Sequence, residues 1–235
     1  MFKNINFKNI LFIDIETVPA YPAYNQLPDN FKYLWDQKAE RLKKSDIETS
    51  DQLYEKAGIY AEFGKIICIS TAYLHQKELR VKSFYGDNEK TLLLDFADLL
   101  NTYFNKSSKL LCAHNGKEFD YPYIARRMLI NQIKLPYILN IAGKKPWQIP
   151  HLDTLELWKF GDYKHYTSLA LLSEIFEIPS PKDDIDGSDI AQVYWKDNDL
   201  ERIIHYCQKD VIALTQLFLR YHLKPLIKEE NIKIQ

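Results

Sequence analysis

Four short apolar segments near the start of the chain have the length and residue types of β-strands, and their order constrains the fold most. They lie at residues 10–15, 65–74, 79–85 and 109–114. A turn at 75–78 separates the second segment from the third, which predicts a hairpin. A helix that either Asp87 or Asn88 can cap, and that is predicted to continue through Phe104, connects the third segment to the fourth, so we expect one strand-helix-strand crossover.

Helical patterns dominate the remainder of the chain, at residues 120–131, 155–160, 167–176, 188–195 and about 199–221. Asn198 and Glu201 have capping-box spacing, which predicts the start of the last helix. Because strands come early and helices late, we expect an α/β fold with a mixed central sheet flanked by helices. The 235 residues fit a single domain, 1–235. Residues 20–63 are long for a connection between strands and predict a helical insertion.

The composition excludes several classes of protein. Hydrophobic residues make up 46% and charged residues 27%, and no apolar run approaches the ~18 residues needed to cross a bilayer. We therefore expect no membrane association, and the absence of a secretory signal predicts a cytoplasmic location. The three cysteines, Cys68, Cys112 and Cys207, are predicted to be buried free thiols. A net charge of -1 offers no broad basic surface for non-specific binding to duplexes.

Two acidic residues interrupt the apolar run of the first strand, in the stretch LFIDIETVP. Alternate side chains of a strand share a face, so Asp14 and Glu16 are predicted to point the same way. Burying two like charges side by side is costly unless a cation compensates, and a divalent metal ion does so compactly. A strand end that emerges into solvent would also explain the pair, so this stretch alone leaves both interpretations open.

Two further acids lie where the predicted elements can bring them to the same sheet. Asp120 opens a helix soon after the fourth strand, in AHNGKEFDYPYI, and Asp210 lies in the last helix on the same face as Tyr206. Taken singly, Asp120 is more often a helix N-cap and Asp210 a solvated helix residue. Asp153 has two interpretations, a helix cap and an acid that supports the site.

Together and in this order, the motifs resemble those of the DEDD, or DnaQ-like, 3′-to-5′ exonuclease superfamily, whose members have an RNase H-like fold. The matching residues are Asp14 and Glu16, then Asn115, Phe119 and Asp120, then Tyr206 and Asp210. Longer segments, including HLDTLELW and YCQKDVIALTQLFLRY, resemble stand-alone bacterial exonucleases related to the exonuclease domain of family-B DNA polymerases. The resemblance covers most of the chain and is weakest over residues 20–63.

The resemblance implies a metal-dependent enzyme that hydrolyses phosphodiester bonds at the 3′ end of single-stranded or frayed DNA and releases nucleoside 5′-monophosphates. The carboxylates of Asp14, Glu16, Asp120 and Asp210 would bind two Mg²⁺ ions, which Mn²⁺ can replace. A 3′-to-5′ exoribonuclease and a non-catalytic nucleic-acid-binding adaptor with the same fold are the alternatives. No polymerase or repair partner is specified.

The residues expected to contact substrate come from the same resemblance. Thr17, Asn115 and Phe119 would lie near the terminal nucleotide, and Gly187, in KDDIDGS, would permit close approach of the backbone. Basic side chains can hold phosphates, but the sequence favours no individual one among Arg126, Arg127, Lys144 and Lys145.

The superfamily divides according to whether a Tyr four residues before the last Asp, or a His five residues before it, assists the attacking water. This sequence has both, Tyr206 and His205. At about 100° per helical residue, Tyr206 lies ~40° from Asp210 and His205 ~140° away. A continuous helix therefore favours Tyr206 and the DEDDy subtype, whereas a break would let His205 swing round.

Overall fold

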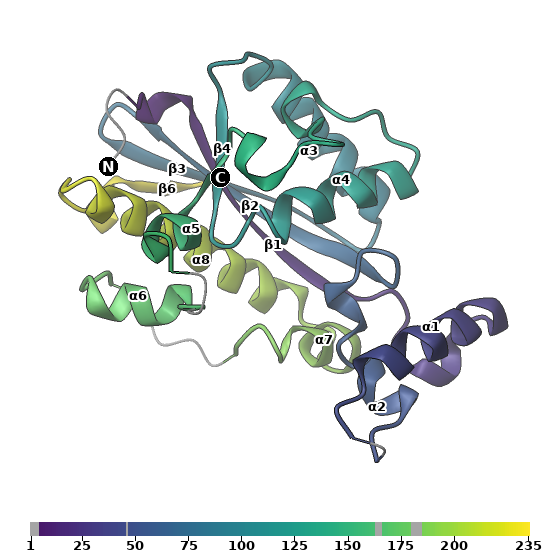
Figure 1. The fold of residues 1–235 in the computed structure, drawn as a ribbon. Coiled ribbons are helices and arrows are strands. Elements are labelled where there is room, and N and C mark those ends of the chain that lie inside the picture. Colours follow the sequence, from purple (N-terminus) through teal and green to yellow (C-terminus); the bar gives the residue numbers. More distant parts are fainter. Residues whose placement is uncertain (1–4, 46, 163–165, 180–184) are drawn as a thin grey trace.

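A six-stranded mixed sheet forms the centre of the computed structural model, which describes residues 5–45, 47–162, 166–179 and 185–235 (Figure 1). The strands are β1 (Ile10–Pro19), β2 (Gly64–His75), β3 (Glu78–Tyr85), β4 (Leu110–Ala113), β5 (Leu152–Asp153) and β6 (Ile232–Ile234), in the order β5-β4-β1-β2-β3-β6. β2 pairs antiparallel with β1 and β3, whereas β1–β4, β4–β5 and β3–β6 are parallel. The predicted α/β fold with a mixed sheet is confirmed.

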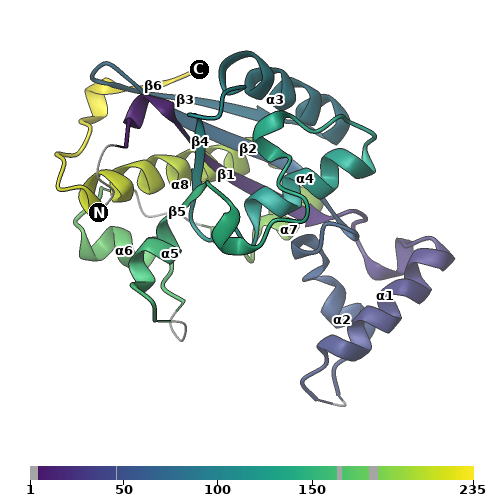
Figure 2. The same cartoon turned by 45° about the horizontal axis from the view of Figure 1, so that its top comes forward.

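Eight α-helices surround or extend this sheet within the described ranges. They are α1 (Asp29–Leu42), α2 (Ser50–Tyr54), α3 (Glu89–Tyr103), α4 (Asp120–Ile130), α5 (Thr154–Lys159), α6 (Leu169–Ile175), α7 (Ile190–Gln192) and α8 (Leu200–Tyr221). α3 and α4 lie on one face and α8 on the other (Figures 1 and 2). Within the described ranges, no helix has the length and apolar character needed to cross a bilayer.

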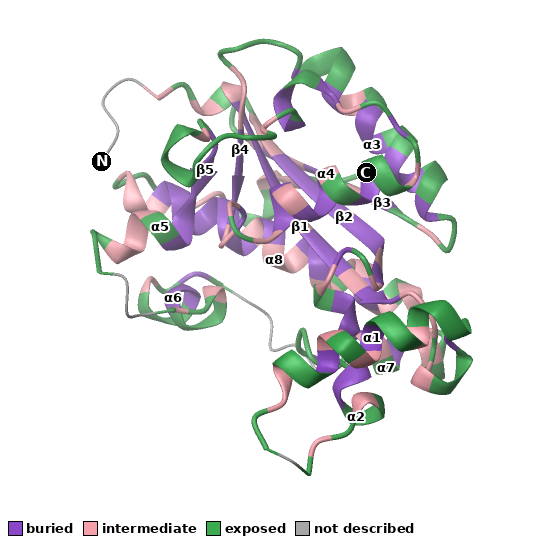
Figure 3. Ribbon diagram, turned by 45° about the vertical axis from the view of Figure 1, so that its right-hand side comes forward, coloured by how far each residue is buried: buried purple, intermediate pink, exposed green. Residues whose placement is uncertain are grey.

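The alternation of β1 divides its side chains between two cores. Leu11, Ile13 and Ile15 pack in the cluster under α3 and α4, whereas Ile10 and Phe12 pack against α8. Figure 3 shows the strands at the centre of the sheet as largely buried. Because side chains alternate along a strand, the next even-numbered residues of β1 also face α8. Asp14 and Glu16 therefore project toward α8, the helix that carries Tyr206 and Asp210.

The short neighbour β4 leaves part of β1 uncovered. β4 pairs with β1 only from Ile10 to Phe12 and ends at Ala113. On that side, no described strand pairs with the rest of β1, so its edge opens beside the loop that leads into α4. This opening lies next to the acidic residues of β1.

Several predicted boundaries were wrong. β1 continues to Pro19, so its two acids lie within the strand and not at an end that emerges into solvent. The predicted capping box is absent, because Asp199, not Asn198, is the N-cap of α8 and accepts a hydrogen bond from the N–H of Arg202. Asn198 instead has a left-handed backbone with φ of 53° and ends the π-helical turn Val193–Asp197. The predicted helix at 188–195 is thus α7 followed by this turn.

The segment at 20–63 folds around an aromatic cluster of its own. Trp35 of α1 is fully buried, contacts Tyr54 and Phe63 edge-on, and donates a 2.8 Å hydrogen bond from Nε1 to the carbonyl oxygen of Ser50. α1 and α2 extend from the sheet beyond the end of β1 (Figure 2). The segment therefore adds helices beyond the end of β1 that follows the two acids.

Candidate active site

Four acidic side chains from three elements meet at the open edge of β1. Asp14 and Glu16 come from β1, Asp120 is the first residue of α4, and Asp210 lies in α8. The negative charges of Asp120 and Asp210 raise the pKa of both Asp14 and Glu16. The four carboxylates predicted from sequence therefore share one electrostatic environment.

Burial makes this environment unfavourable for charge. Glu16 is 7% exposed and Asp120 only 4%. Loss of solvent is the main cause that raises the pKa of Asp14 and of Glu16, and neighbouring carboxylates add to it. Burial also raises the pKa of Asp120 to about 8, against a hydrogen bond from its own backbone N–H that lowers it. Such carboxylates are stabilised in their ionised form when a cation binds among them.

The thiol of Cys207 lies close to the two acids of β1. The Sγ atom of Cys207, on α8, lies 3.4 Å from Oδ2 of Asp14. Asp14, Glu16 and Cys207 each offer a potential ligand atom, and these atoms all lie within 4.8 Å of one another. The prediction that Cys68, Cys112 and Cys207 are buried free thiols is confirmed. The contact with Asp14 was missed, although Cys207 lies three residues before Asp210 and thus on the sheet-facing side of α8.

Asp153 fixes the loop that leads from β4 to Asp120. Its Oδ1 accepts 3.0 Å hydrogen bonds from the N–H groups of Asn115 and Leu155, and its Oδ2 accepts one of 3.0 Å from Lys117. The carboxylate thus caps α5, which confirms the helix-cap interpretation, and it also holds the loop that precedes α4. Asp120 is not an N-cap, because Phe119 occupies that position of α4.

Gly116, in the same loop, must be a glycine. An added Cβ would lie 2.4 Å from Cβ of Ala113 and 2.9 Å from the ring of Tyr121. The neighbouring Asn115 has a left-handed φ of 64°, a conformation that Asn tolerates. Close packing and this backbone conformation define the path by which the chain turns from β4 to Asp120.

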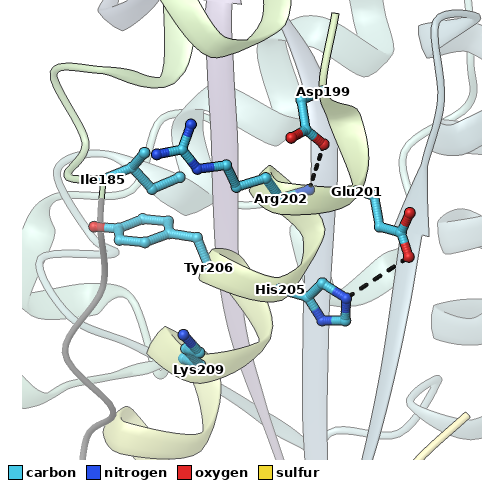
Figure 4. A pocket seen from close by; sticks show the side chains of 7 residues that line it. All are labelled: Ile185, Asp199, Glu201, Arg202, His205, Tyr206 and Lys209. Atoms are coloured by element: carbon cyan, nitrogen blue, oxygen red, sulfur yellow. Dashed lines mark hydrogen bonds and ion pairs between the residues drawn. The ribbon is translucent and has the colours of Figure 1, made fainter. Parts of the chain in front are cut away.

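Tyr206 and His205 point to different sides of α8. The Tyr206 hydroxyl is hydrogen-bonded to the carboxylate of Asp210, and burial together with Asp210 raises the pKa of this hydroxyl. The His205 side chain is 63% exposed, with Nε2 3.9 Å from Oε1 of Glu201. Figure 4 shows the two rings on opposite sides of the helix. α8 runs unbroken through both residues, so the break that would favour His205 is absent.

A cavity of about 460 Å³ opens beside Tyr206 (Figure 4). Its lining residues are Ile185, Asp199, Glu201, Arg202, His205, Tyr206 and Lys209. Six of these seven belong to α8 or its N-cap, so the cavity lies along the helix that carries Tyr206 and Asp210.

The residues expected to contact substrate occupy different surroundings. Thr17 is hydrogen-bonded to Tyr123, and the ring of Tyr123 lies 5.2 Å from that of Phe119, so the structure brings these two candidates to one tyrosine. An added Cβ at Gly187 would meet nothing within 4 Å, so space alone does not require glycine there. Lys182, Asp183 and Asp184 of the same loop lie outside the described residues.

Arg127 has a structural role that removes it from the candidate phosphate ligands. Its Nε donates a 2.8 Å hydrogen bond to Glu89 and its Nη1 one of 2.7 Å to the carbonyl oxygen of Ala61. Glu89 also accepts a 2.7 Å hydrogen bond from the N–H of Ile66. The buried guanidinium therefore connects α4, α3 and the start of β2. Arg126, Lys144 and Lys145 are exposed.

The fold and the site together define an α/β protein with a partly buried carboxylate cluster beside β1 of a mixed sheet. A family model described as "Predicted 3′-5′ exonuclease related to the exonuclease domain of PolB" matches residues 59–232. The chain belongs to this family. Exonucleases of this kind usually use divalent metal ions, and the acidic cluster provides a possible site for them.

A solved structure supports the fold. The family B DNA polymerase from the hyperthermophilic archaeon Pyrobaculum calidifontis is similar to this chain with a TM-score of 0.53 and 14% sequence identity. The match covers 91% of this chain and 24% of the polymerase chain, so this protein spans about a quarter of the polymerase's length. The exonuclease domain of PolB has an RNase H-like fold, so the predicted fold class is confirmed.

Proposed function

We propose that this protein is a metal-dependent 3′-to-5′ exonuclease of the DEDDy subtype. Its substrate would be single-stranded or frayed DNA, from which it releases nucleoside 5′-monophosphates. The observation that carries the proposal is the cluster of Asp14, Glu16, Asp120 and Asp210, of which Glu16 and Asp120 are buried, in a chain whose family is described as predicted 3′-5′ exonucleases.

The donor set fits hard divalent cations. Carboxylate oxygens are the ligands that Mg²⁺ and Mn²⁺ prefer. Burial and neighbouring negative charge raise the pKa of Asp14, Glu16 and Asp120, so a bound cation would stabilise their ionised forms. We assign Asp14, Glu16, Asp120 and Asp210 to two Mg²⁺ ions, with Mn²⁺ as a substitute. When bound, the ions would stabilise charge on the phosphoryl oxygens and lower the pKa of a water molecule.

The side chains around the cluster would position the reactants. The Tyr206 hydroxyl, held by Asp210 and kept protonated by its raised pKa, can orient the attacking water by hydrogen bonding. We assign Thr17, Asn115 and Phe119 to the terminal nucleotide, and Gly187 to the mouth of the cleft. The Tyr123 contacts support a joint role for Thr17 and Phe119.

One experiment tests the proposal and its alternatives. Single-stranded DNA and RNA of the same sequence, labelled at the 5′ end, are incubated with the protein and Mg²⁺ or Mn²⁺. We expect stepwise shortening of DNA from the 3′ end that Asp14→Ala abolishes, while the matched Asp98→Ala variant, altered at an exposed site on α3, keeps full activity. A preference for RNA would overturn the substrate assignment. Binding without shortening would identify a non-catalytic adaptor.

A further inference from the structure

The part of the chain that includes α4 and the connection to α5 has an unusual charge. From residue 121 to residue 152 it contains no Asp or Glu, although these acids together number 32 among the 235 residues. Its Arg and Lys residues are Arg126, Arg127, Lys134, Lys144 and Lys145. Arg127 is buried against Glu89, whereas the other four are exposed. A chain with a net charge of -1 thus has a local basic surface here.

An exposed tryptophan lies on this basic surface. The exposed fraction of Trp147 is 76%, whereas Trp35 is buried and Trp158 and Trp195 are half-buried. Nζ of Lys145 lies 5.2 Å from the centroid of the Trp147 ring. The ammonium group occupies one face of the ring, and the exposure of the residue leaves apolar ring surface in water. Covering this surface with a ligand is favourable.

Hydrogen bonds within residues 141–149, which we call the Trp147 loop, hold these side chains in place. The N–H of Lys144 donates a 3.1 Å hydrogen bond to the carbonyl oxygen of Ile141, across a turn in which Gly143 has a φ of 74°. The N–H of Lys145 donates one of 2.9 Å to Oε1 of Gln148. The loop therefore presents its ring and its two ammonium groups with little ordering left to pay for on binding.

His151 connects the Trp147 loop to the carboxylate site. The His151 ring lies edge-on to that of Tyr121, the residue after Asp120, with the ring centres 5.2 Å apart. Burial lowers the pKa of His151 to about 4, and the charges of Lys144 and Lys117 contribute to this shift. Lys117 belongs to the loop that leads to Asp120. The Trp147 loop therefore lies beside that loop.

This combination of groups fits an unpaired nucleic-acid strand. An unpaired base stacks on an aromatic ring, whereas the bases of a duplex are already stacked on each other. Ammonium groups attract the phosphates on either side of the base. The carboxylate cluster repels every phosphate that is not next to a metal ion, so the binding free energy of a strand has to come from other contacts. An acidic peptide would satisfy the lysines but would leave the ring without a planar partner.

We propose that the Trp147 loop binds single-stranded nucleic acid away from the bond that is cut, with one unpaired base stacked on Trp147 and the neighbouring phosphates at Lys144 and Lys145. The ligand is recognised by its unpaired base and its charge, and not by its sequence. The inference rests on the proposed function in one respect, because that function makes a single strand the substrate.

Binding in EDTA tests the stacking contact without catalysis. Fluorescence anisotropy of a 5′-labelled thymidine 10-mer measures affinity, and an unlabelled 10-mer should quench the tryptophan fluorescence of the wild type. Trp147→Phe should abolish most of this quenching and keep most of the affinity. Trp147→Ala should weaken binding about tenfold, as the loss of one stacked base predicts. Tyr33→Ala, at an exposed aromatic residue of α1, is the matched control and should bind as the wild type does.

The salt dependence of the same binding tests the phosphate contacts. Lys144→Gln and Lys145→Gln should each reduce the slope of log K against log salt by about 0.7. Lys77→Gln, an equal charge change at the exposed turn between β2 and β3, should leave the slope unchanged. A blunt duplex of the same length should bind more weakly than the single strand and should not quench Trp147.

Hydrolysis separates strand binding from chemistry. On the 10-mer, Trp147→Ala should raise KM about tenfold and leave kcat nearly unchanged. The p-nitrophenyl ester of thymidine 5′-monophosphate has one phosphodiester and no further nucleotides, so its hydrolysis should not change. Equal losses on the two substrates would overturn the proposal, because Trp147 would then act at the reaction centre or in folding.

The remaining outcomes are equally decisive. Wild-type affinity in Trp147→Ala, or wild-type salt slopes in both Gln variants, would overturn the proposal. A polyglutamate peptide that quenches Trp147 and displaces the 10-mer would identify an acidic protein partner instead. If the wild type hydrolyses neither substrate, the proposed function is wrong, and the quenching and the salt slopes still decide whether this loop binds a single strand.

Discussion

Cys207 places its Sγ atom 3.4 Å from Oδ2 of Asp14 and 3.5 Å from the carbonyl oxygen of the same residue. A side chain of α8 thereby contacts both the carboxylate and the backbone of β1. Burial raises the pKa of the Cys207 thiol, so the group is neutral and donates to Asp14. A soft sulfur ligand thus lies within reach of a site otherwise composed of hard oxygen ligands.

This contact predicts sensitivity to thiophilic metal ions. Cd²⁺ binds sulfur far better than Mg²⁺ does, and a coordinating thiol is deprotonated by the ion. We expect Cd²⁺ to inhibit the Mg²⁺-supported nuclease, and Cys207→Ala to raise the inhibitory concentration at least about tenfold, as the loss of one metal ligand implies. Cys112→Ala, which removes a buried thiol on β4, is the control. Equal Cd²⁺ sensitivity of all three proteins would contradict the prediction.

The raised pKa of Asp120 predicts how the metal-free protein responds to pH. Its value of about 8, against an ordinary 3.8, means that the folded protein holds this proton more tightly than the unfolded chain. Ionisation therefore penalises the folded state, and stability should fall as pH rises from about 4 to about 8. Asp120→Asn cannot ionise, so this variant should be more stable than the wild type at pH 8 and similar at pH 4.

Thermal unfolding in EDTA at several pH values measures this difference. Asp98→Asn, at an exposed position of α3, should follow the wild-type dependence. If Asp120→Asn retains the wild-type slope between pH 4 and pH 8, other groups cause the loss of stability.

The sequence predicted those parts of the fold that depend on local patterns. Apolar runs located β1 to β4, and alternation placed Asp14 and Glu16 on one face. β5 and β6 were missed because two or three residues carry no periodicity, and these strands exist only by pairing with β4 and β3. The α8 cap was misplaced because Asn198 and Asp199 are adjacent and both suit an N-cap. Only the left-handed backbone of Asn198 decides between them.

The site was predictable to the extent that it consists of motifs in a fixed order. Asp14, Glu16, Asp120 and Asp210 were proposed in this way, and in the structure the charges of Asp120 and Asp210 act on Asp14 and Glu16. The hydrogen bonds of Asp153 were not predictable in detail, because its carboxylate accepts them from backbone N–H groups that lie 38 and 36 residues earlier in the chain, those of Asn115 and Lys117. The same applies to the Cys207 contact, which spans nearly the whole chain. The spacing of residues within one helix or strand predicts which side chains share a face. Contacts between different helices, strands and loops can be identified only when the fold is known.

Asp153 predicts a link between loop geometry and catalysis. Asp153→Asn replaces one acceptor oxygen with an NH₂ group, so at least one of the N–H groups of Asn115, Lys117 and Leu155 loses its partner. A lost buried hydrogen bond of this kind costs about 1–3 kcal/mol. We expect a lower free energy of unfolding and a lower kcat, because the same loop positions Asp120. Urea unfolding and single-strand hydrolysis measure the two effects. Asp98→Asn, at an exposed position of α3, is the control and should change neither strongly.

The buried ion pair of Arg127 and Glu89 predicts a purely structural loss. Arg127→Met leaves the Glu89 carboxylate buried without its cation, which costs about 3–5 kcal/mol. Urea unfolding at pH 7 should reveal this loss, whereas exposed Arg126→Met should change stability by less than about 0.5 kcal/mol. A stable Arg127→Met variant with weakened DNA binding would instead indicate a phosphate contact.

Tyr206 and His205 provide the sharpest test of the assigned chemistry. The Tyr206 hydroxyl is hydrogen-bonded to Asp210, whereas His205 is exposed and faces Glu201, so only the tyrosine can reach a water at the cluster. Tyr206→Phe removes that hydroxyl and keeps the ring, and we expect kcat to fall about a hundredfold with little change in KM. His205→Ala should retain activity within about threefold, because its side chain contacts no residue of the cluster. Steady-state kinetics on single-stranded DNA separates the two. A large loss in His205→Ala combined with an active Tyr206→Phe would reverse the assignment, and would mean that α8 rearranges when substrate binds.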